Sequence, residues 1–420
     1  MMTPKRVFIT GIGIINPAGI GKDVFWRNIT DGNSAIRNIT RFNTMDHPVK
    51  IAGEITEFDP VDFIPRRLMI KSDRFTHYAI AATELALNDA NINMEQEDPY
   101  RVGVWLGNNS GGWDIYEKGL YQLYRDGAAM INPWQACAWF PTAAQSYITI
   151  RYGIKGYSKS FVCDRASGAS GLYFAIKSIQ QGYNNVVFAG GTEAPITSFG
   201  MTCYYETGEL SAATTPEGAY QPFAQKRTGV VLGEGSTILV LESEEHAIRR
   251  GAKIYGEVVS SCMTTDFNPT SGIQFERAMR KALKDADLTP TDIDVVLAEG
   301  CGTKVSDLVE ARALKAVFEE APNLLVTVPK SLYGHLYGAS CITEVACSLL
   351  SMETGNLPTM QKIDELDPDC QLNFVTQPQK RPISRTMVNS RAREGVNVSF
   401  VISKYLQTTT NNNRANASCQ

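Results

Sequence analysis

The sequence has few of the residues that build metal centres or disulfide frameworks. Its four histidines are dispersed, and its nine cysteines include no Cys-x-x-Cys pair. Scattered cysteines in an odd number are typical of reduced thiols in a cytoplasmic protein. A zinc site needs clustered cysteine and histidine ligands, so we expect no metal. No Gly-x-Gly-x-x-Gly motif opens a predicted helix, and we expect no nucleotide cofactor either.

Long apolar runs and an excess of one charge are also missing. No window reaches the roughly 18 consecutive apolar residues that a membrane-spanning helix needs. The net charge of −4 gives no reason to expect a nucleic acid or a membrane surface as a partner. The N-terminal run MMTPKRVFITGIGII is interrupted by glycines, which indicates a buried strand and turn instead of a signal peptide. The sequence therefore predicts a cytoplasmic protein.

Short β-branched runs next to glycines alternate with helical stretches. Continuous apolar strands of this kind are typical of a sheet that is buried on both faces. The predicted strands include residues 6–11, 101–107, 185–191, 294–300 and 395–402. The predicted helices include residues 74–90, 168–181, 274–286 and 306–319. This alternation indicates a layered α/β fold.

The pattern occurs twice along the 420 residues. Residues 1–250 form a predicted first half, with an aromatic-rich insertion at about residues 108–160. Residues 251–406 form a shorter second half, although no literal sequence repeat is visible. Residues 407–420 are polar and unpatterned, and we predict that this tail is disordered.

Four long segments, in the same order, resemble the β-ketoacyl synthase family, the condensing enzymes of fatty-acid and polyketide synthesis. They are KRVFITGIGIINPAGIGKDVFWRNITDGNSAI, NNVVFAGGTEAPIT, QPFAQKRTGVVLGEGSTILVLESEEHAIRRGAKIYGEV and PKSLYGHLYGASCITE. The resemblance covers about residues 4–405. It implies a thiolase-like fold, a duplicated five-layer α/β/α/β/α architecture that works as a dimer.

The resemblance also implies an active site with a cysteine at a buried helix N-terminus, two histidines and a lysine. A thiolate there takes the acyl group, and the imidazoles assist decarboxylation and carbon–carbon bond formation. In this sequence the cysteine position falls on Arg165, which cannot lose its proton and is no nucleophile. The first histidine falls on Glu299. The second histidine and the lysine are retained as His335 and Lys330.

The family's mobile gate near the C-terminus, NSFGFGG in many members, is also altered. Here it reads NSRAREG, with Arg391 and Arg393 in place of the phenylalanines. Changes at three functional positions suggest compensation, because a lone buried Arg165 would be costly. We therefore predict an ion pair between Arg165 and Glu299 that fills a degenerate site.

In such a degenerate site His335 and Lys330 would be structural remnants, with Glu344 as the partner of Lys330. Cys163 offers an alternative nucleophile, since it lies two residues before Arg165 and on the same side of a strand. It would lie in the strand and not at the helix N-terminus, so we favour a buried apolar role for it.

The cysteine-less members of this family include the chain-length factors of type II polyketide synthases. The resemblance implies a subunit without activity of its own, paired with a catalytic ketosynthase as a heterodimer. Its second expected partner is an acyl carrier protein with a phosphopantetheine-linked polyketide. Many members carry glutamine at the cysteine position, so Arg165 is a departure. Two alternatives stay open: an enzyme with altered chemistry, such as a malonyl-carrier decarboxylase or a condensing enzyme that uses Cys163, and a self-associating protein that sequesters acyl carriers.

The segment GGWDIYEKGLYQLY resembles the helix that lines the polyketide tunnel near the dimer interface. Trp113, Tyr116 and Leu120 are spaced i, i+3 and i+7, so they share one helix face. The resemblance implies that they set the depth of the tunnel, and two bulky aromatic rings would close it early. Ordinary packing at an interface is a second role for these residues, and it is compatible with the first.

Overall fold

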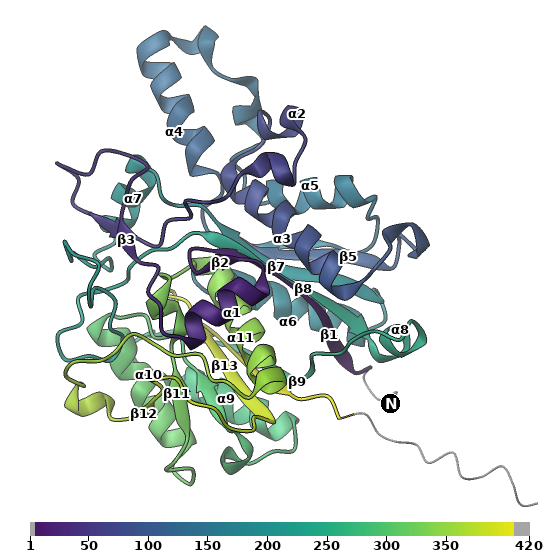
Figure 1. Cartoon of the computed structure of the whole chain (residues 1–420), viewed down its shortest axis with the longest axis vertical. Coiled ribbons are helices and arrows are strands. Elements are labelled where there is room, and N and C mark those ends of the chain that lie inside the picture. Colours follow the sequence, from purple (N-terminus) through teal and green to yellow (C-terminus); the bar gives the residue numbers. More distant parts are fainter. Residues whose placement is uncertain (1–4, 407–420) are drawn as a thin grey trace, which may run out of the picture.

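The computed structural model describes residues 5–406, and all of its strands except β3 and β4 belong to one long mixed sheet in two sections (Figure 1). The sections join where Phe8 and Ile9 pair with Glu257 and Gly256. The first section has the order β1 (Val7–Asn16), β8 (Gly235–Ser243), β7 (Val186–Glu193), β5 (Val102–Gly107) and β6 (Lys159–Phe161). The second has the order β9 (Gly256–Thr265), β14 (Val396–Ser403), β13 (Arg385–Arg391), β10 (Val295–Leu297), β11 (Leu325–Thr327) and β12 (Asn373–Phe374). The short strands are β2 (Gly19–Ile20), which pairs with β1, and β3 (Arg37–Asn38) and β4 (Ile51–Ala52), which pair with each other.

The two sections repeat one pattern of strand directions. From β1 to β6 the pairings are antiparallel, antiparallel, parallel and parallel. From β9 the same series recurs and ends with one further parallel pair, β11 with β12. The pattern confirms the duplicated architecture that the sequence predicts.

Helices form the other three layers. Two buried helices, α6 (Ser167–Gln180) and α11 (Ser340–Thr354), lie between the sheet sections and share one core with both. The outer face of the first section is covered by α3 (Arg74–Ala90) and α5 (Ala143–Tyr152), and that of the second by α9 (Ile273–Asp285) and α10 (Lys304–Val317). The order of layers is therefore α/β/α/β/α, as predicted. The remaining α-helices are α1 (Lys22–Thr30), α2 (Arg66–Met69), α4 (Trp113–Tyr121), α7 (Ser198–Tyr205) and α8 (Glu244–Arg249).

Small residues let the central helices meet where the candidate site lies. A Cβ atom on Gly168 of α6 would lie 2.0 Å from the carbonyl oxygen of Gly338, which precedes α11. A Cβ atom on Gly191 at the end of β7 would meet the same oxygen at 2.0 Å. Only glycine permits this approach, which brings the start of α6 close to the start of α11.

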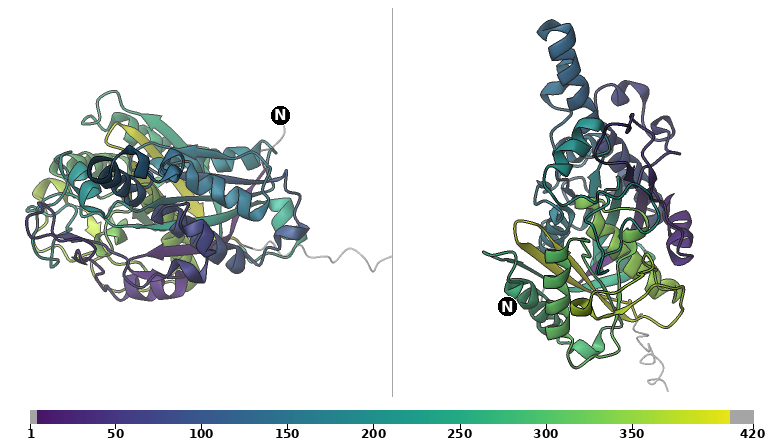
Figure 2. Two further views of the ribbon diagram at one scale, coloured as in Figure 1. Left: turned by 90° about the horizontal axis from the view of Figure 1, so that it is seen from above. Right: turned by 90° about the vertical axis from the view of Figure 1, so that its left-hand side faces the viewer.

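Part of the aromatic-rich insertion forms an arm that projects from the body, while its last residues form α5 and the start of β6. The arm consists of α4, a π-helical turn at Gln122–Asp126 and the irregular segment that follows (Figures 1 and 2). Tyr121, Tyr124 and Met130 on this arm are each at least 60% exposed, so the arm is apolar as well as prominent. Within residues 5–406, no helix is long and apolar enough to cross a membrane. The predicted disordered tail, residues 407–420, lies outside the described residues.

Candidate functional site

A tight turn between β6 and α6 carries Arg165. Asp164 has a φ of +49°, the left-handed conformation that aspartate tolerates better than most residues. The Ser167 hydroxyl donates to the Asp164 carbonyl at 2.6 Å and accepts from the Cys163 N–H at 2.9 Å. This turn directs Arg165 inward, where it is 2% exposed. Arg165 comes directly before Ala166, which occupies the N-cap position of α6.

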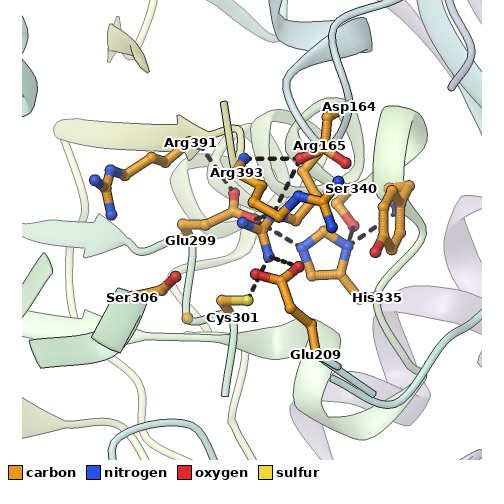
Figure 3. A network of polar contacts seen from close by, with 12 residues as sticks. Asp164, Arg165, Glu209, Glu299, Cys301, Ser306, His335, Ser340, Arg391 and Arg393 are labelled. Atoms are coloured by element: carbon orange, nitrogen blue, oxygen red, sulfur yellow. Dashed lines mark hydrogen bonds and ion pairs between the residues drawn. The ribbon is translucent and has the colours of Figure 1, made fainter. Parts of the chain in front are cut away.

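Three carboxylates surround the buried Arg165 guanidinium (Figure 3). Its Nη1 lies 3.4 Å from Glu209 Oε2, and its Nε lies 3.5 Å from Asp164 Oδ2 and 4.0 Å from Glu299 Oε1. Nη1 also donates to the Cys301 thiol. The predicted pair with Glu299 is thus the longest of the three contacts. Glu209 follows α7 and had no motif to mark it, yet it is the nearer partner.

Glu299 bonds more closely to His335 and Lys330 than to Arg165. Its Oε1 lies 2.7 Å from His335 Nε2, and Lys330 Nζ lies 3.7 Å from its Oε2. Burial alone would raise the pKa of Glu299. The Lys330 ammonium, the His335 ring and the Arg165 guanidinium outweigh burial and lower this pKa to about 2. Glu299 is therefore an anion at physiological pH.

The hydrogen bonds of His335 fix its tautomer. The Tyr337 N–H donates to Nδ1 at 3.0 Å, so Nδ1 carries no proton and Nε2 does. The Ser340 hydroxyl also lies 3.2 Å from Nδ1. Burial lowers the pKa of His335 to about 4, against the opposing influence of Glu299, so the ring is neutral. Its single N–H donates to Glu299 and is not free to stabilise an oxyanion.

Lys330 is fully buried, and the structure pairs it with Glu344 at 2.9 Å, as predicted. Lys330 also donates to the Glu299 carbonyl oxygen at 2.6 Å. A further carboxylate, Glu310, accepts the N–H groups of Glu299 and Gly300 at 2.8 Å each. Glu310 comes from α10 and holds the turn that carries Glu299, a role that the sequence did not reveal.

The two arginines of the altered gate have opposite environments. Arg391, at the end of β13, is 5% exposed, and its Nε donates to Asn397 Oδ1 at 3.2 Å. Arg393 lies in the turn that follows and its side chain reaches solvent, where it contacts Glu394 at 3.2 Å. The Arg393 N–H donates to Asp164 Oδ2 at 2.8 Å. The turn is thus fastened to the residue next to Arg165.

Cys163 is half-buried, which corrects the expectation of a buried apolar role. It lies in a pocket of about 400 Å³ whose walls include Asp164, Tyr337 and Arg393. Cys163 belongs to neither element, since β6 ends at Phe161 and α6 begins at Ser167. Within residues 5–406, its thiol makes no hydrogen bond. The histidine that a cysteine nucleophile would need is committed to Glu299.

The candidate tunnel residues lie on α4 in a row of aromatic rings. The rings of Trp113 and Tyr116 both pack on Phe199 of α7. Each of the two ring centroids lies 5.8 Å from the centroid of the Phe199 ring. Trp113 also contacts Tyr204, which lies 4.8 Å from Tyr337, the neighbour of His335. Leu120 is half-buried one turn farther along α4. The row extends from the buried polar site toward the base of the arm.

Comparisons with known proteins match this chain over most of its length. Residues 4–247 fit the family model of the β-ketoacyl synthase N-terminal domain, and residues 252–364 fit that of the C-terminal domain. The chain is 33% identical over 410 residues to the tetracenomycin polyketide synthase ketoacyl synthase beta subunit of Streptomyces glaucescens, covering 96% of this chain and 100% of that protein.

It is 36% identical over 413 residues to 3-oxoacyl-[acyl-carrier-protein] synthase 2 of Staphylococcus aureus, with coverage of 96% and 100%. A solved structure described as the ishigamide ketosynthase/chain length factor matches with a TM-score of 0.86 and 27% identity, covering 96% of this chain and 100% of that one. The relatives thus include both a condensing enzyme and a beta subunit.

Proposed function

Because the chain belongs to the β-ketoacyl synthase family, we propose that it is a non-catalytic chain-length factor of a type II polyketide synthase. It would pair with a catalytic ketosynthase and shape the tunnel that limits the length of the polyketide. One observation carries this proposal: the buried Arg165 guanidinium lies where the family resemblance expects the nucleophile. A guanidinium stays protonated and cannot attack a thioester as a cysteine thiolate would.

The neighbours of Arg165 argue against a decarboxylase that works without a cysteine. Decarboxylation of a malonyl thioester leaves an enolate oxygen, which needs hydrogen-bond donors. Here Glu299 stands at the position of the first histidine donor. Its carboxylate also accepts the single N–H of the second donor, His335. A developing oxyanion would face the negative charge of Glu299 and be repelled.

An open sheet edge supports pairing with a second subunit. Strand β6 ends the first section, and within the described residues its outer edge has no partner. Around it Tyr157, Val162, Phe174 and Tyr183 are between 39% and 56% exposed. An unpaired edge flanked by apolar side chains favours association with another chain. We assign this edge to a catalytic ketosynthase of the same fold.

The aromatic row supports the role in chain length. Trp113 and Tyr116 fill the space between α4 and α7, and Leu120 continues their helix face. In a heterodimer these side chains would end a tunnel that enters from the catalytic subunit. Aromatic rings at the end of a tunnel limit how many ketide units fit. The growing chain would arrive on the phosphopantetheine arm of an acyl carrier protein.

The test is co-expression with a catalytic ketosynthase from the same biosynthetic system, followed by native mass and product analysis. We expect a 1:1 complex whose Trp113→Ala variant makes longer polyketides. Tyr124→Ala, which trims an exposed aromatic ring on the same arm, is the matched control for product length. Cys163→Ala should leave turnover unchanged. A homodimer that condenses or decarboxylates malonyl carriers by itself, and loses this activity in Cys163→Ala, would refute the proposal.

A further inference from the structure

The indole ring of Trp113 is held by a hydrogen bond as well as by packing. Its Nε1–H donates to the Ser110 hydroxyl oxygen at 2.7 Å, and the Tyr204 hydroxyl donates to the same oxygen at 3.2 Å. The single proton of the Ser110 hydroxyl is directed at Glu193 Oε2, 3.4 Å away. Both lone pairs and the proton of this hydroxyl are therefore in use, so the group has one orientation.

The position of Ser110 is fixed by the residues around it. The Asn109 N–H donates to Glu193 Oε1, and the Asn109 side chain donates to the Tyr204 hydroxyl at 2.9 Å. Glu193 ends β7 and is fully buried. Its Oε1 also accepts the Gly338 N–H at 3.2 Å, which connects the turn before α4 with the chain before α11. The acceptor of the indole N–H thus belongs to the buried centre of the molecule and not to the projecting arm.

Helix α7 supplies the apolar surface against which this ring packs. The ring centroids of Phe199 and Tyr204 lie 5.8 Å and 6.3 Å from that of Trp113. A Cβ atom on Gly200 would lie 3.1 Å from Trp113 Cδ2, so the indole lies close to the backbone of the helix. Apolar contact is non-directional, whereas a hydrogen bond is directional. The bond to Ser110 therefore decides which edge of the indole faces the buried polar residues.

We propose that Ser110 is a positioning residue for chain length: its hydroxyl holds the Trp113 indole in one orientation, so that the tunnel has a fixed end and the synthase makes a narrow range of products. This inference rests on the proposed function, since it requires Trp113 to end a polyketide tunnel. An indole free to change its side-chain torsions would leave space for a further ketide unit in a fraction of turnovers. Loss of one neutral hydrogen bond shifts such an equilibrium about fivefold.

Product analysis of the 1:1 complex tests the role of Ser110 directly. Ser110→Ala should raise the share of products longer than the main wild-type product about fivefold, and Ser110→Thr, which keeps a hydroxyl, should stay near the wild type. In a Trp113→Ala background, Ser110→Ala should add no further change, because the ring through which it acts is absent. Ser146→Ala is the matched control, because it removes an exposed hydroxyl from α5. An equal further increase in the double variant would mean that Ser110 acts by another route, and would overturn the proposal.

Fluorine NMR of the same complex, labelled with fluorotryptophan, gives a measurement that does not depend on the products. The Trp113 line is assigned by its loss in Trp113→Phe. We expect one Trp113 line in the wild type, and a broadened or second line in Ser110→Ala. Unchanged products or an unchanged line in Ser110→Ala would overturn the role of Ser110. If Trp113→Ala still lengthens the products in that case, only this inference is wrong. If it does not, or if no 1:1 complex forms, the proposed function itself has failed.

Discussion

Two buried histidines of this protein have opposite protonation states. His246 in α8 lies between two carboxylates, with Nδ1 2.5 Å from Glu242 and Nε2 3.0 Å from Glu97. These bonds raise the pKa of His246 to about 9, so the ring is a cation. His335 also contacts a carboxylate, yet burial lowers its pKa to about 4. A carboxylate neighbour is thus not sufficient to protonate a histidine.

The difference lies in the remaining charges around each ring. His335 has one carboxylate, Glu299, and the cations Lys330 and Arg165 oppose a further positive charge. His246 has two carboxylates and lies nearer to the solvent. In the candidate site Lys330 and Arg165 are therefore the cations, and His335 is a neutral hydrogen-bond donor. The following experiments alter one member of this comparison at a time.

Removal of Arg165 should have the largest effect. Arg165→Met leaves Glu209, Asp164 and Glu299 without their shared cation, and breaking a buried ion pair in this way costs about 3–5 kcal/mol. Urea unfolding monitored by circular dichroism measures the loss. Lys281→Met, at an exposed ion pair on α9, should leave the midpoint unchanged.

A double-mutant cycle separates charge from packing at the same position. Adding Glu209→Gln to Arg165→Met should restore part of the lost stability, because the carboxylate nearest to the missing guanidinium becomes neutral. Equal losses in the single and double variants would mean that Arg165 stabilises the site by its volume alone. The rescue should be partial, because Asp164 and Glu299 stay charged near position 165.

The sequence predicted the layered fold well because apolar strands and helical stretches are local patterns. It also identified Arg165, Glu299, His335 and Lys330 as one group, since their segments resemble a known active site. The sequence could not predict which of these residues pair most closely with each other. Glu209 and Glu310 come from segments with no recognisable motif, and only the fold brings them to Arg165 and Glu299.

The altered gate segment is a second place where the sequence did not predict the environment of its residues. Arg391 and Arg393 are two residues apart, and their identities gave no sign that one is buried and the other exposed. The turn decides this, because β13 ends at Arg391 and the chain reverses at once. Cys163 was misjudged for a related reason: the chain leaves the sheet at Phe161, so the rules for strand side chains no longer apply.

Alkaline conditions should weaken the His246 cluster. The pKa of His246 is about 9 when folded and near 6.5 when unfolded, so its contribution is complete below pH 6.5 and is lost as the pH rises through 9. We expect a loss of roughly 2 kcal/mol, less than the full shift implies because the ring is partly hydrated. Urea midpoints between pH 6 and 10 measure it. His246→Gln should be less stable at pH 6 and lack this alkaline slope; an unchanged slope would contradict the assignment.

Acidic conditions should weaken the site around His335. Its pKa is about 4 when folded and near 6.5 when unfolded, so the unfolded chain takes up a proton first as the pH falls. Stability should decrease by about 1–2 kcal/mol between pH 6.5 and 4, in the direction opposite to that of His246. The difference between wild type and His335→Gln isolates this effect from the carboxylates. If His335→Gln retains the full acidic slope, other groups cause it.

The two gate arginines should give the smallest effect and the sharpest contrast. Arg391→Leu removes the bonds to Asn397 and Pro269 but keeps apolar contact with Phe275, so we expect a loss of about 1 kcal/mol. Arg393→Leu should leave stability unchanged, because its side chain reaches solvent and its anchor is a backbone N–H that leucine retains. Thermal unfolding of both variants makes the comparison. Equal losses of stability in the two variants would contradict this expectation. They would show that the charge of both arginines stabilises the turn, and that the burial of Arg391 does not.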